Sequence, residues 1–207
     1  NLLGCWDFES PESTTNWTHL APNPAAPFDL WHLSSADPDP VQSGDSILEV
    51  NERTVTTAWR LANDPSGSDV DATYNFANLK VIADLVSPPI DASSVANIYV
   101  SWNEFVDTEA GMDLTRVFVQ SPSNIVAVPI SPAVSGPGAG WVHRTADFTA
   151  FAGEPEIRII FRFQTINSQN QNFRGWWVDD VKVYETASIS GWVRSKKGAP
   201  IQEADVL

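Results

Sequence analysis

The sequence predicts an all-β fold in which two antiparallel sheets pack face to face, and three observations predict it. Apolar and polar residues alternate with a period of two along much of the 207-residue chain, whereas helical periodicity is almost absent. Aromatic residues make up 11% of the chain, including nine Trp, and they favour half-buried pleated surfaces. Clusters of Pro, Gly, Asn, Asp and Ser separate the alternating runs and favour turns.

The strands follow from the alternating runs. The clearest run is EIRIIFRFQT, which places Ile157, Ile159, Phe161 and Phe163 on one face and mostly charged residues on the other. In chain order the predicted strands are 47–51, 55–61, 79–86, 97–105, 115–120, 125–130, 141–148, 156–165 and 177–184. The turn sequences NDPSGSD, VSPPID, QSPSN, SGPGAG and TINSQNQN lie between them. About ten short strands with one polar face each indicate an antiparallel two-sheet sandwich.

The charge balance limits the classes of partner. The chain has 26 Asp and Glu against 12 Lys and Arg, which gives a formal net charge of −14. Because phosphate binding needs basic patches, neither nucleic acid nor an anionic membrane is an expected partner. The charge is compatible both with simple solubility and with acidic loops that hold calcium.

Other features of the composition concern the membrane and the cellular compartment. No apolar run approaches the ~20 residues that span a bilayer, so no membrane insertion is expected. The single Cys5 cannot form an internal disulfide, so it does not indicate an oxidising compartment. The sequence has neither an initiator Met nor a signal peptide, which predicts a processed piece of a longer precursor.

A break near Glu185 predicts two parts, a sandwich domain at 1–186 and a short tail at 187–207. The tail, ISGWVRSKKGAPIQEADVL, is expected to form a strand, a basic Gly-Pro turn and the start of a second strand. A segment this short cannot bury a core of its own. It is therefore either the edge of a following domain or a strand that completes another molecule's sheet. The residues assigned to such an assembly contact are Ile189, Val193, Ile201 and Val206.

Known catalytic patterns are missing from the sequence. The three His are scattered, with no H-E-x-x-H arrangement, and neither a G-x-S-x-G elbow nor a glycine-rich phosphate loop occurs. The nearest approach to an acid pair for glycoside hydrolysis is in WNEFVDTEAGMD, among Glu104, Asp107, Glu109 and Asp113. Such a pair would have to face a cleft at a separation of ~5–10 Å. We expect a non-catalytic protein and assign no catalytic residue.

The segment NFRGWWVDDVKVYE places two carboxylates at the start of an apolar strand. Regular alternation puts Asp179 on one face with Trp177, Val181 and Val183, toward the core, and leaves Trp176 and Asp180 on the other. A buried ionised carboxylate must be paired, hydrogen-bonded or bound to a cation. Two readings therefore stay open for Asp179, a ligand of calcium and a turn cap that accepts main-chain N–H groups.

Several segments taken together resemble a known family. NLLGCWDFES opens the series, LVSPPID and GWWVDDVKVYE in combination are its most specific segments, and the likeness runs from residue 1 to about 185. The series resembles the MAM-like jelly-roll modules of secreted immune-inhibitor-A-type metallopeptidases and gingipain-type adhesins. The resemblance implies a concanavalin-like jelly roll whose first and last strands pair. With the sequence pattern, the expected fold is an antiparallel two-sheet jelly-roll sandwich with an extra C-terminal strand segment.

The same resemblance implies a structural calcium ion. In such modules, the Glu after the first Phe and an Asp of the final D-D motif meet at the cation. Carried to this sequence, these are Glu9 and Asp179, with Asp180 and Asp45 as further candidate ligands. The carboxylates would then join the two ends of the domain and would not form a reaction centre.

The tail is similar to the opening of carboxypeptidase-regulatory-like domains, in which I-S-G-x-V is followed by a G-x-P-I turn. Because such domains occur in strings in secreted and surface proteins, the similarity implies an extracellular, multidomain parent. Jelly-roll carbohydrate modules also use exposed aromatic platforms, and Trp31, Trp141 and Trp176 are the candidates here. Each of these residues is also open to being a core aromatic, which is the commoner place for Trp.

Two functions follow from this sequence. The first is a non-catalytic, extracellular module for adhesion or assembly, in contact with other domains or with copies of itself. The second is a carbohydrate-binding module that is accessory to a secreted hydrolase or peptidase and binds a polysaccharide. An exposed coplanar row of aromatic rings would favour the second, and strand pairing between molecules at the tail would favour the first.

Overall fold

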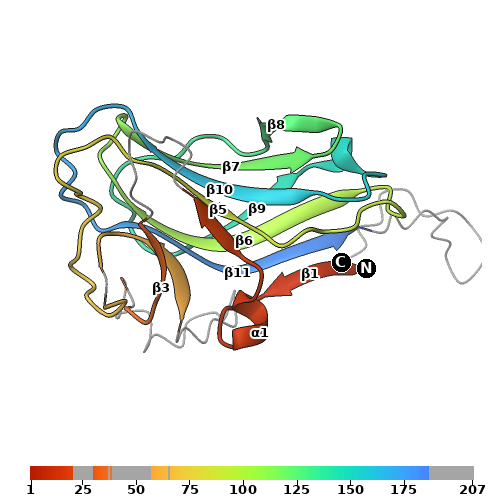
Figure 1. The fold of residues 1–207 in the computed structure, drawn as a ribbon, viewed down its shortest axis with the longest axis horizontal. Coiled ribbons are helices and arrows are strands. Elements are labelled where there is room, and N and C mark those ends of the chain that lie inside the picture. The colour runs from red at the N-terminus through yellow and green to blue at the C-terminus, as the bar shows by residue number, and fades with distance from the viewer. Residues whose placement is uncertain (21–29, 37, 39–56, 65, 187–207) are drawn as a thin grey trace, which may run out of the picture.

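The fold is an all-β, antiparallel two-sheet jelly-roll sandwich, as the sequence predicts (Figure 1). The structure, a computed structural model, describes residues 1–20, 30–36, 38, 57–64 and 66–186. Its elements are β1 (Leu2–Trp6), α1 (Pro11–Thr14), β2 (Thr18–Leu20), β3 (Trp31–Ser34), β4 (Ala58–Leu61), β5 (Ile82–Val86), β6 (Ile98–Asp107), β7 (Asp113–Ser121), β8 (Asn124–Pro129), β9 (Val142–Asp147), the 3-10 helix η2 (Thr149–Phe151), β10 (Arg158–Thr165) and β11 (Gly175–Glu185). The predicted strand 47–51 and the tail 187–207 lie outside the described residues.

The strands form two sheets, which we call sheet A and sheet B. Sheet A has the order β3-β4-β11-β6-β9, and β1 also pairs with β11. Sheet B has the order β2-β5-β10-β7-β8. The strand pairs of both sheets are antiparallel.

β11 is the strand to which both ends of the domain attach. One edge pairs with β6 along most of its length, and the other edge pairs first with β4 and then with β1. The N-terminal strand therefore joins the last described strand, as the resemblance implied, and the main-chain oxygen of Asn1 accepts from the N–H of Glu185 at 2.7 Å. In Figure 1 the N-terminus lies beside β1 and β11.

A β-bulge in β11 corrects the predicted facing of the D-D segment. Asp179 lies opposite Asn103 and Lys182 lies opposite Ser101, so two residues of β11 face a single residue of β6. Asp180 is the extra residue of the bulge, and its φ is 49°. Trp177 and Asp179 share a face, as predicted, but it is the outer face of sheet A.

Beyond the bulge, the alternation of inward-facing and outward-facing side chains along β11 shifts by one residue. Val181 and Val183 therefore lie on the core side with Trp176 and Val178, and not with Asp179 as predicted.

The core fills the space between the two sheets. The predicted apolar face of β10 is confirmed, because Ile157, Ile159, Phe161 and Phe163 are each 0% exposed. Phe161 contacts the rings of Trp17, Trp102 and Trp176 at centroid distances of 6.2, 5.8 and 5.8 Å. A smaller apolar cluster, formed by Ala58, Phe105 and Trp177 with Trp141 against it, lies on the outer face of sheet A.

We expect Gly175→Ala to destabilise the domain far more than Gly153→Ala. Both glycines have positive φ, 100° and 88°, which L-residues rarely adopt. A Cβ at Gly175 would collide with the main-chain oxygen of Leu61, whereas a Cβ at Gly153 meets nothing within 4 Å. Chemical denaturation should show a loss of about 1 kcal/mol for Gly153→Ala and about 3 kcal/mol or more for Gly175→Ala. Equal losses would contradict the close approach of β4 to β11.

Candidate binding site

Two of the three predicted tryptophan platforms are core residues. Trp31 is 2% exposed and Trp176 is 0% exposed, and their rings contact each other at 5.4 Å between centroids. Neither presents a ring face to solvent, so the prediction of a platform is wrong for both. Trp141 is half-buried and packs edge-on against Phe105, at 6.1 Å between centroids. It alone of the three lies at the surface.

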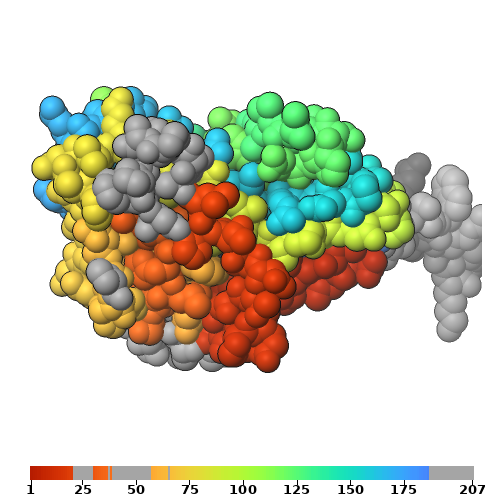
Figure 2. Space-filling model, viewed as in Figure 1, coloured from red at the N-terminus to blue at the C-terminus, as the bar shows by residue number. Residues whose placement is uncertain are grey.

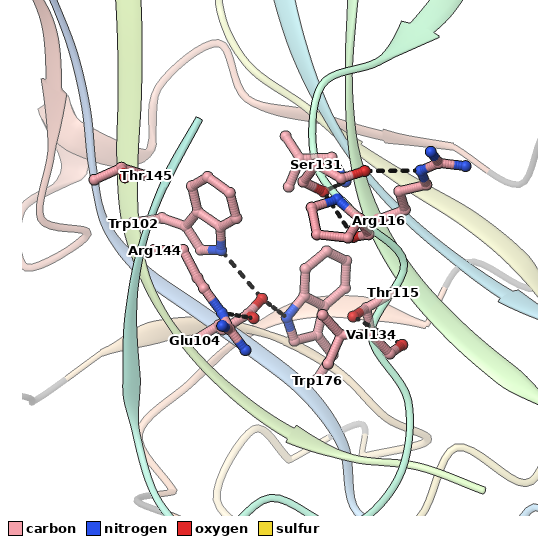
Figure 3. Close-up of a pocket in the computed structure, with 11 residues that line it drawn as sticks. Trp102, Glu104, Thr115, Arg116, Ser131, Val134, Arg144, Thr145 and Trp176 are labelled. Carbon is pink, nitrogen blue, oxygen red and sulfur yellow. Dashed lines mark hydrogen bonds and ion pairs between the residues drawn. The ribbon is translucent and has the colours of Figure 1, made fainter. Parts of the chain in front are cut away.

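A pocket opens between the edges of the two sheets and contains a buried carboxylate (Figure 3). Glu104 of β6 is 3% exposed and points between the sheets. Its Oε2 accepts from the indole N–H groups of Trp102 and Trp176, at 3.1 and 3.0 Å. Its Oε1 accepts from Nε of Arg144 at 2.8 Å. Glu104 therefore fixes two core indoles and an arginine of the edge strand β9.

The pocket has a volume of about 150 Å³. A cavity of that size holds about one six-membered ring, which is less than the usual size of a ligand site. Both indoles that line it are almost fully buried. The carboxylate is already neutralised by Arg144, so the arrangement supports a structural role better than a binding role.

Among the described residues, the acidic segment WNEFVDTEAGMD does not form a reaction centre. Glu104 binds two indoles, Asp107 pairs with Arg174 at 2.8 Å, and Asp113 is 0% exposed. Glu109 accepts from the side-chain amide of Asn170 at 2.8 Å. Each carboxylate thus has its own structural partner, and the arrangement shows no pair across an open cleft.

The outer face of sheet B carries polar and aromatic side chains on the adjacent strands β5, β10 and β7, and we call it the sheet B face. Figure 2 shows the green segment that includes β7 and β8 at the surface of the molecule. Arg162 of β10 binds Asp84 of β5 with two hydrogen bonds, at 2.7 and 2.6 Å. Arg116 lies opposite Arg162 on β7 and donates to the main-chain oxygen of Ser131 at 2.9 Å. The two guanidinium groups flank the ring of Phe118, at 5.7 and 5.1 Å from its centroid.

These residues were not among the predicted site residues. The alternation in EIRIIFRFQT does indicate that Arg158 and Arg162 face away from the core. The partners of Arg162 come from β5 and β7, which lie far from β10 in the sequence. No local pattern reveals which strands lie next to each other, so the face emerges only from the sheet order.

Two of the predicted calcium ligands, Asp179 and Asp180, lie where β4 gives way to β1 along β11. β4 pairs with Val178 and β1 pairs with Val181, so Asp179 and Asp180 lie at the change of partner. Glu9, which follows β1, accepts from the N–H of Thr57, just before β4, at 3.1 Å.

The hydrogen bonds of this region fit both readings of the D-D pair. Asp179 is 2% exposed and accepts from the N–H of Asp180 at 2.7 Å, while Asp180 accepts from Asn103 at 2.8 Å. The described residues contain no group of three or more His, Cys, Asp or Glu arranged to hold a metal. Asp45, and the assembly residues Ile189, Val193, Ile201 and Val206, lie outside the described part of the chain.

The buried Arg60 holds the loop that follows β4. Its guanidinium donates to the main-chain oxygens of Asp69 and Ala72 at 2.5 and 2.6 Å, and it lies 4.2 Å from the ring centroid of Trp177. Burial lowers the pKa of Arg60 to about 10, although the charge of Asp64 opposes the shift. The residue stays charged at neutral pH, and its contacts are structural.

Comparisons with known proteins concern the fold. No family model and no curated protein matches the chain. Among solved structures, TmCBM61 in complex with β-1,4-galactotriose has a TM-score of 0.48 at 11% identity, covering 83% of this chain and 90% of that one. The CBM22-1 xylan-binding domain of Xyn10C from Paenibacillus barcinonensis has a TM-score of 0.48 at 7% identity, covering 91% and 97%.

A third structure, the mannan-recognising carbohydrate-binding module TmCBM27, has a TM-score of 0.44 at 16% identity, covering 90% of this chain and 98% of that one. In the described residues, none of the helices has the length and apolar character that crossing a membrane requires.

We expect Glu104→Ala to lower the free energy of unfolding by about 3–5 kcal/mol, because it leaves two buried indole N–H groups and Arg144 without their acceptor. Chemical denaturation measures the loss. The matched control is Glu156→Ala, which removes the exposed ion pair with Arg158 and should change stability by about 1 kcal/mol or less. Similar losses for both variants would contradict the structural role of Glu104.

Proposed function

We propose that this domain is a non-catalytic carbohydrate-binding module that holds a polysaccharide chain on the sheet B face. The observation that supports this best is the fixed row of Asp84, Arg162 and Arg116 beside the ring of Phe118. Sugars present apolar C–H faces and many hydroxyl groups. An aromatic ring with neighbouring planar donors and acceptors suits both properties.

The face is prepared for binding before a ligand arrives. The two hydrogen bonds between Arg162 and Asp84 hold both planar groups in one orientation, while 29% of the Arg162 side chain stays exposed. Groups that are already ordered lose little entropy when a ligand binds. Gln120 and Gln164, on the outward side of β7 and β10, extend the row of amide and guanidinium groups along the strands.

The sign of charge on this face also differs from that of the chain. The outward positions of β5, β7 and β10 include Arg116, Arg158 and Arg162 with the carboxylate of Asp84, and Glu156, just before β10, pairs with Arg158. The whole chain carries a formal charge of −14. Arginine donors collected on one face of an acidic protein favour a ligand rich in oxygen acceptors, as a polysaccharide is.

A second candidate function is adhesion or assembly in an extracellular, multidomain protein of the MAM-like type. The edge strand β8 supports it, because Ile125 and Val126 are both 78% exposed. An apolar edge strand is suited to pairing with another chain. Under this proposal the tail would supply a further strand, with Ile189, Val193, Ile201 and Val206 as its contacts.

We expect Phe118→Ala to weaken binding of soluble polysaccharide by at least about tenfold, because the ring lies at the centre of the proposed face. Affinity electrophoresis in gels containing xylan, mannan or β-1,4-galactan measures the change. The matched control is Tyr184→Ala, which removes an aromatic ring from the outer face of sheet A, beside Tyr99. Unchanged binding by Phe118→Ala, or weakening by Tyr184→Ala alone, would place the ligand elsewhere.

We further propose that a structural calcium ion is bound by Glu9, Asp179 and Asp180, with Asp45. Calcium that binds only the folded state should stabilise it by about 2.7 kcal/mol at a hundred times the dissociation constant. The measurement is the thermal midpoint in excess EDTA and in millimolar calcium, for the natural sequence and for Asp179→Asn. The rise with calcium should shrink in Asp179→Asn. An equal rise in both would indicate that hydrogen bonds alone satisfy Asp179.

A further inference from the structure

Tyr74 connects three segments at one end of the sandwich. Its side chain is 0% exposed, and its hydroxyl donates to Oδ2 of Asp113 at 2.5 Å. The same hydroxyl accepts from the N–H of Glu109 at 3.2 Å. The hydroxyl oxygen of Tyr74 is therefore hydrogen-bonded both to the carboxylate of Asp113 and to the main chain of Glu109. The ring of Tyr74 packs between Phe163 of β10 and Phe173 of the following loop.

Three buried oxygen atoms at this end have no hydrogen-bond partner among the described residues. They are Oδ1 of Asp113, Oε2 of Glu109 and Oε1 of Gln171. Asp113 and Gln171 are 0% and 1% exposed. Nearly all buried polar atoms in proteins are satisfied, so three orphaned acceptors at the same end indicate a group that is not part of the chain.

The contacts of the neighbouring atoms place the three residues at the same end of the sandwich. Asn170, next to Gln171, donates to Oε1 of Glu109 at 2.8 Å. Gln171 uses its amide nitrogen to bond the main-chain oxygen of Leu79 at 2.8 Å, so its Oε1 points away from that segment. Asp113 lies opposite Thr165, where the loop that carries Asn170 and Gln171 begins. These contacts bring the loop 166–174 against the turn between β6 and β7.

The chemistry of the unsatisfied atoms favours a cation. The unsatisfied atoms are all acceptors, two of them on carboxylates close to each other. A bound cation satisfies all three and removes the repulsion.

We propose that Oδ1 of Asp113, Oε2 of Glu109 and Oε1 of Gln171 bind a calcium ion that fastens the loop 166–174 to the β6–β7 turn. Calcium accepts carboxylate and amide oxygens together and tolerates irregular geometry, whereas magnesium demands an octahedron. The set has two carboxylates, fewer than the three or more acidic, His or Cys side chains that would mark a metal cluster among the described residues. Two charged ligands fit an affinity of ~0.1–1 mM, the range of extracellular modules.

This site is separate from the one proposed at Glu9 and Asp179, and it is independent of glycan binding. The loops 72–80 and 166–174, yellow and blue in Figure 1, lie at the end of the sandwich away from the N-terminus. The Asp179 region lies further along β11, where β4 gives way to β1.

The test is a calcium titration of thermal stability in the Asp179→Asn background, so that the other proposed site does not contribute. The midpoint should rise by roughly 5–10 °C when free calcium is about a hundred times the dissociation constant. Adding Asp113→Asn, which keeps a side chain able to accept from Tyr74, should abolish the rise. Adding Glu156→Gln, an exposed carboxylate, should leave the rise unchanged. A rise that survives Asp113→Asn, or no rise in the background, would overturn the proposal.

A second variant distinguishes a bound cation from a buried proton or water molecule. It does not require the Asp179→Asn background to fold. Gln171→Glu, in the natural sequence, adds a third carboxylate to the set. With a cation, this variant should be less stable than the natural sequence in EDTA and should show the larger calcium response, saturating at lower calcium. A variant that is destabilised to the same extent with and without calcium would show that the three oxygens share a proton or water and would overturn the proposal.

Discussion

The bulge in β11 is the constraint on which the arrangement of this domain depends. β11 must pair with β6 along one edge and with both β4 and β1 along the other. The extra residue at Asp180 changes which side chains face the core partway along the strand. Val181 can then continue the apolar face that Trp176 begins, while Asp179 stays outside the sandwich. Without the bulge, one half of the strand would turn its valines outward.

Much of the charge in the interior stabilises the fold. Glu104 fixes two core indoles, and Arg60 holds the loop after β4 through main-chain oxygens. The burial of such charged groups costs little net stability only when their hydrogen bonds are complete. Arg116 and Arg162 on the sheet B face also have partners within the chain, but 29% of the Arg162 side chain stays exposed, and this is the face that we propose for a ligand.

The sequence predicts the fold class well and the site poorly, for physical reasons. Long strands such as β10 show clear alternation because each has one buried face, and Ile159, Phe161 and Phe163 were assigned correctly. The three-residue β2 is too short to show a pattern, and the bulge at Asp180 breaks the assumed alternation. Trp31 and Trp176 could not be distinguished from surface platforms, because burial depends on which strands become neighbours.

The central claim, that the sheet B face binds a polysaccharide, is tested most directly by mapping backbone amide chemical shifts on addition of xylo-, manno- and β-1,4-galacto-oligosaccharides. The account predicts that at least one of them shifts the amides of β5, β7 and β10, with the largest changes around Phe118 and Arg162. Shifts confined to sheet A or to the edge strand β8, or no shifts with any of the three, would contradict it.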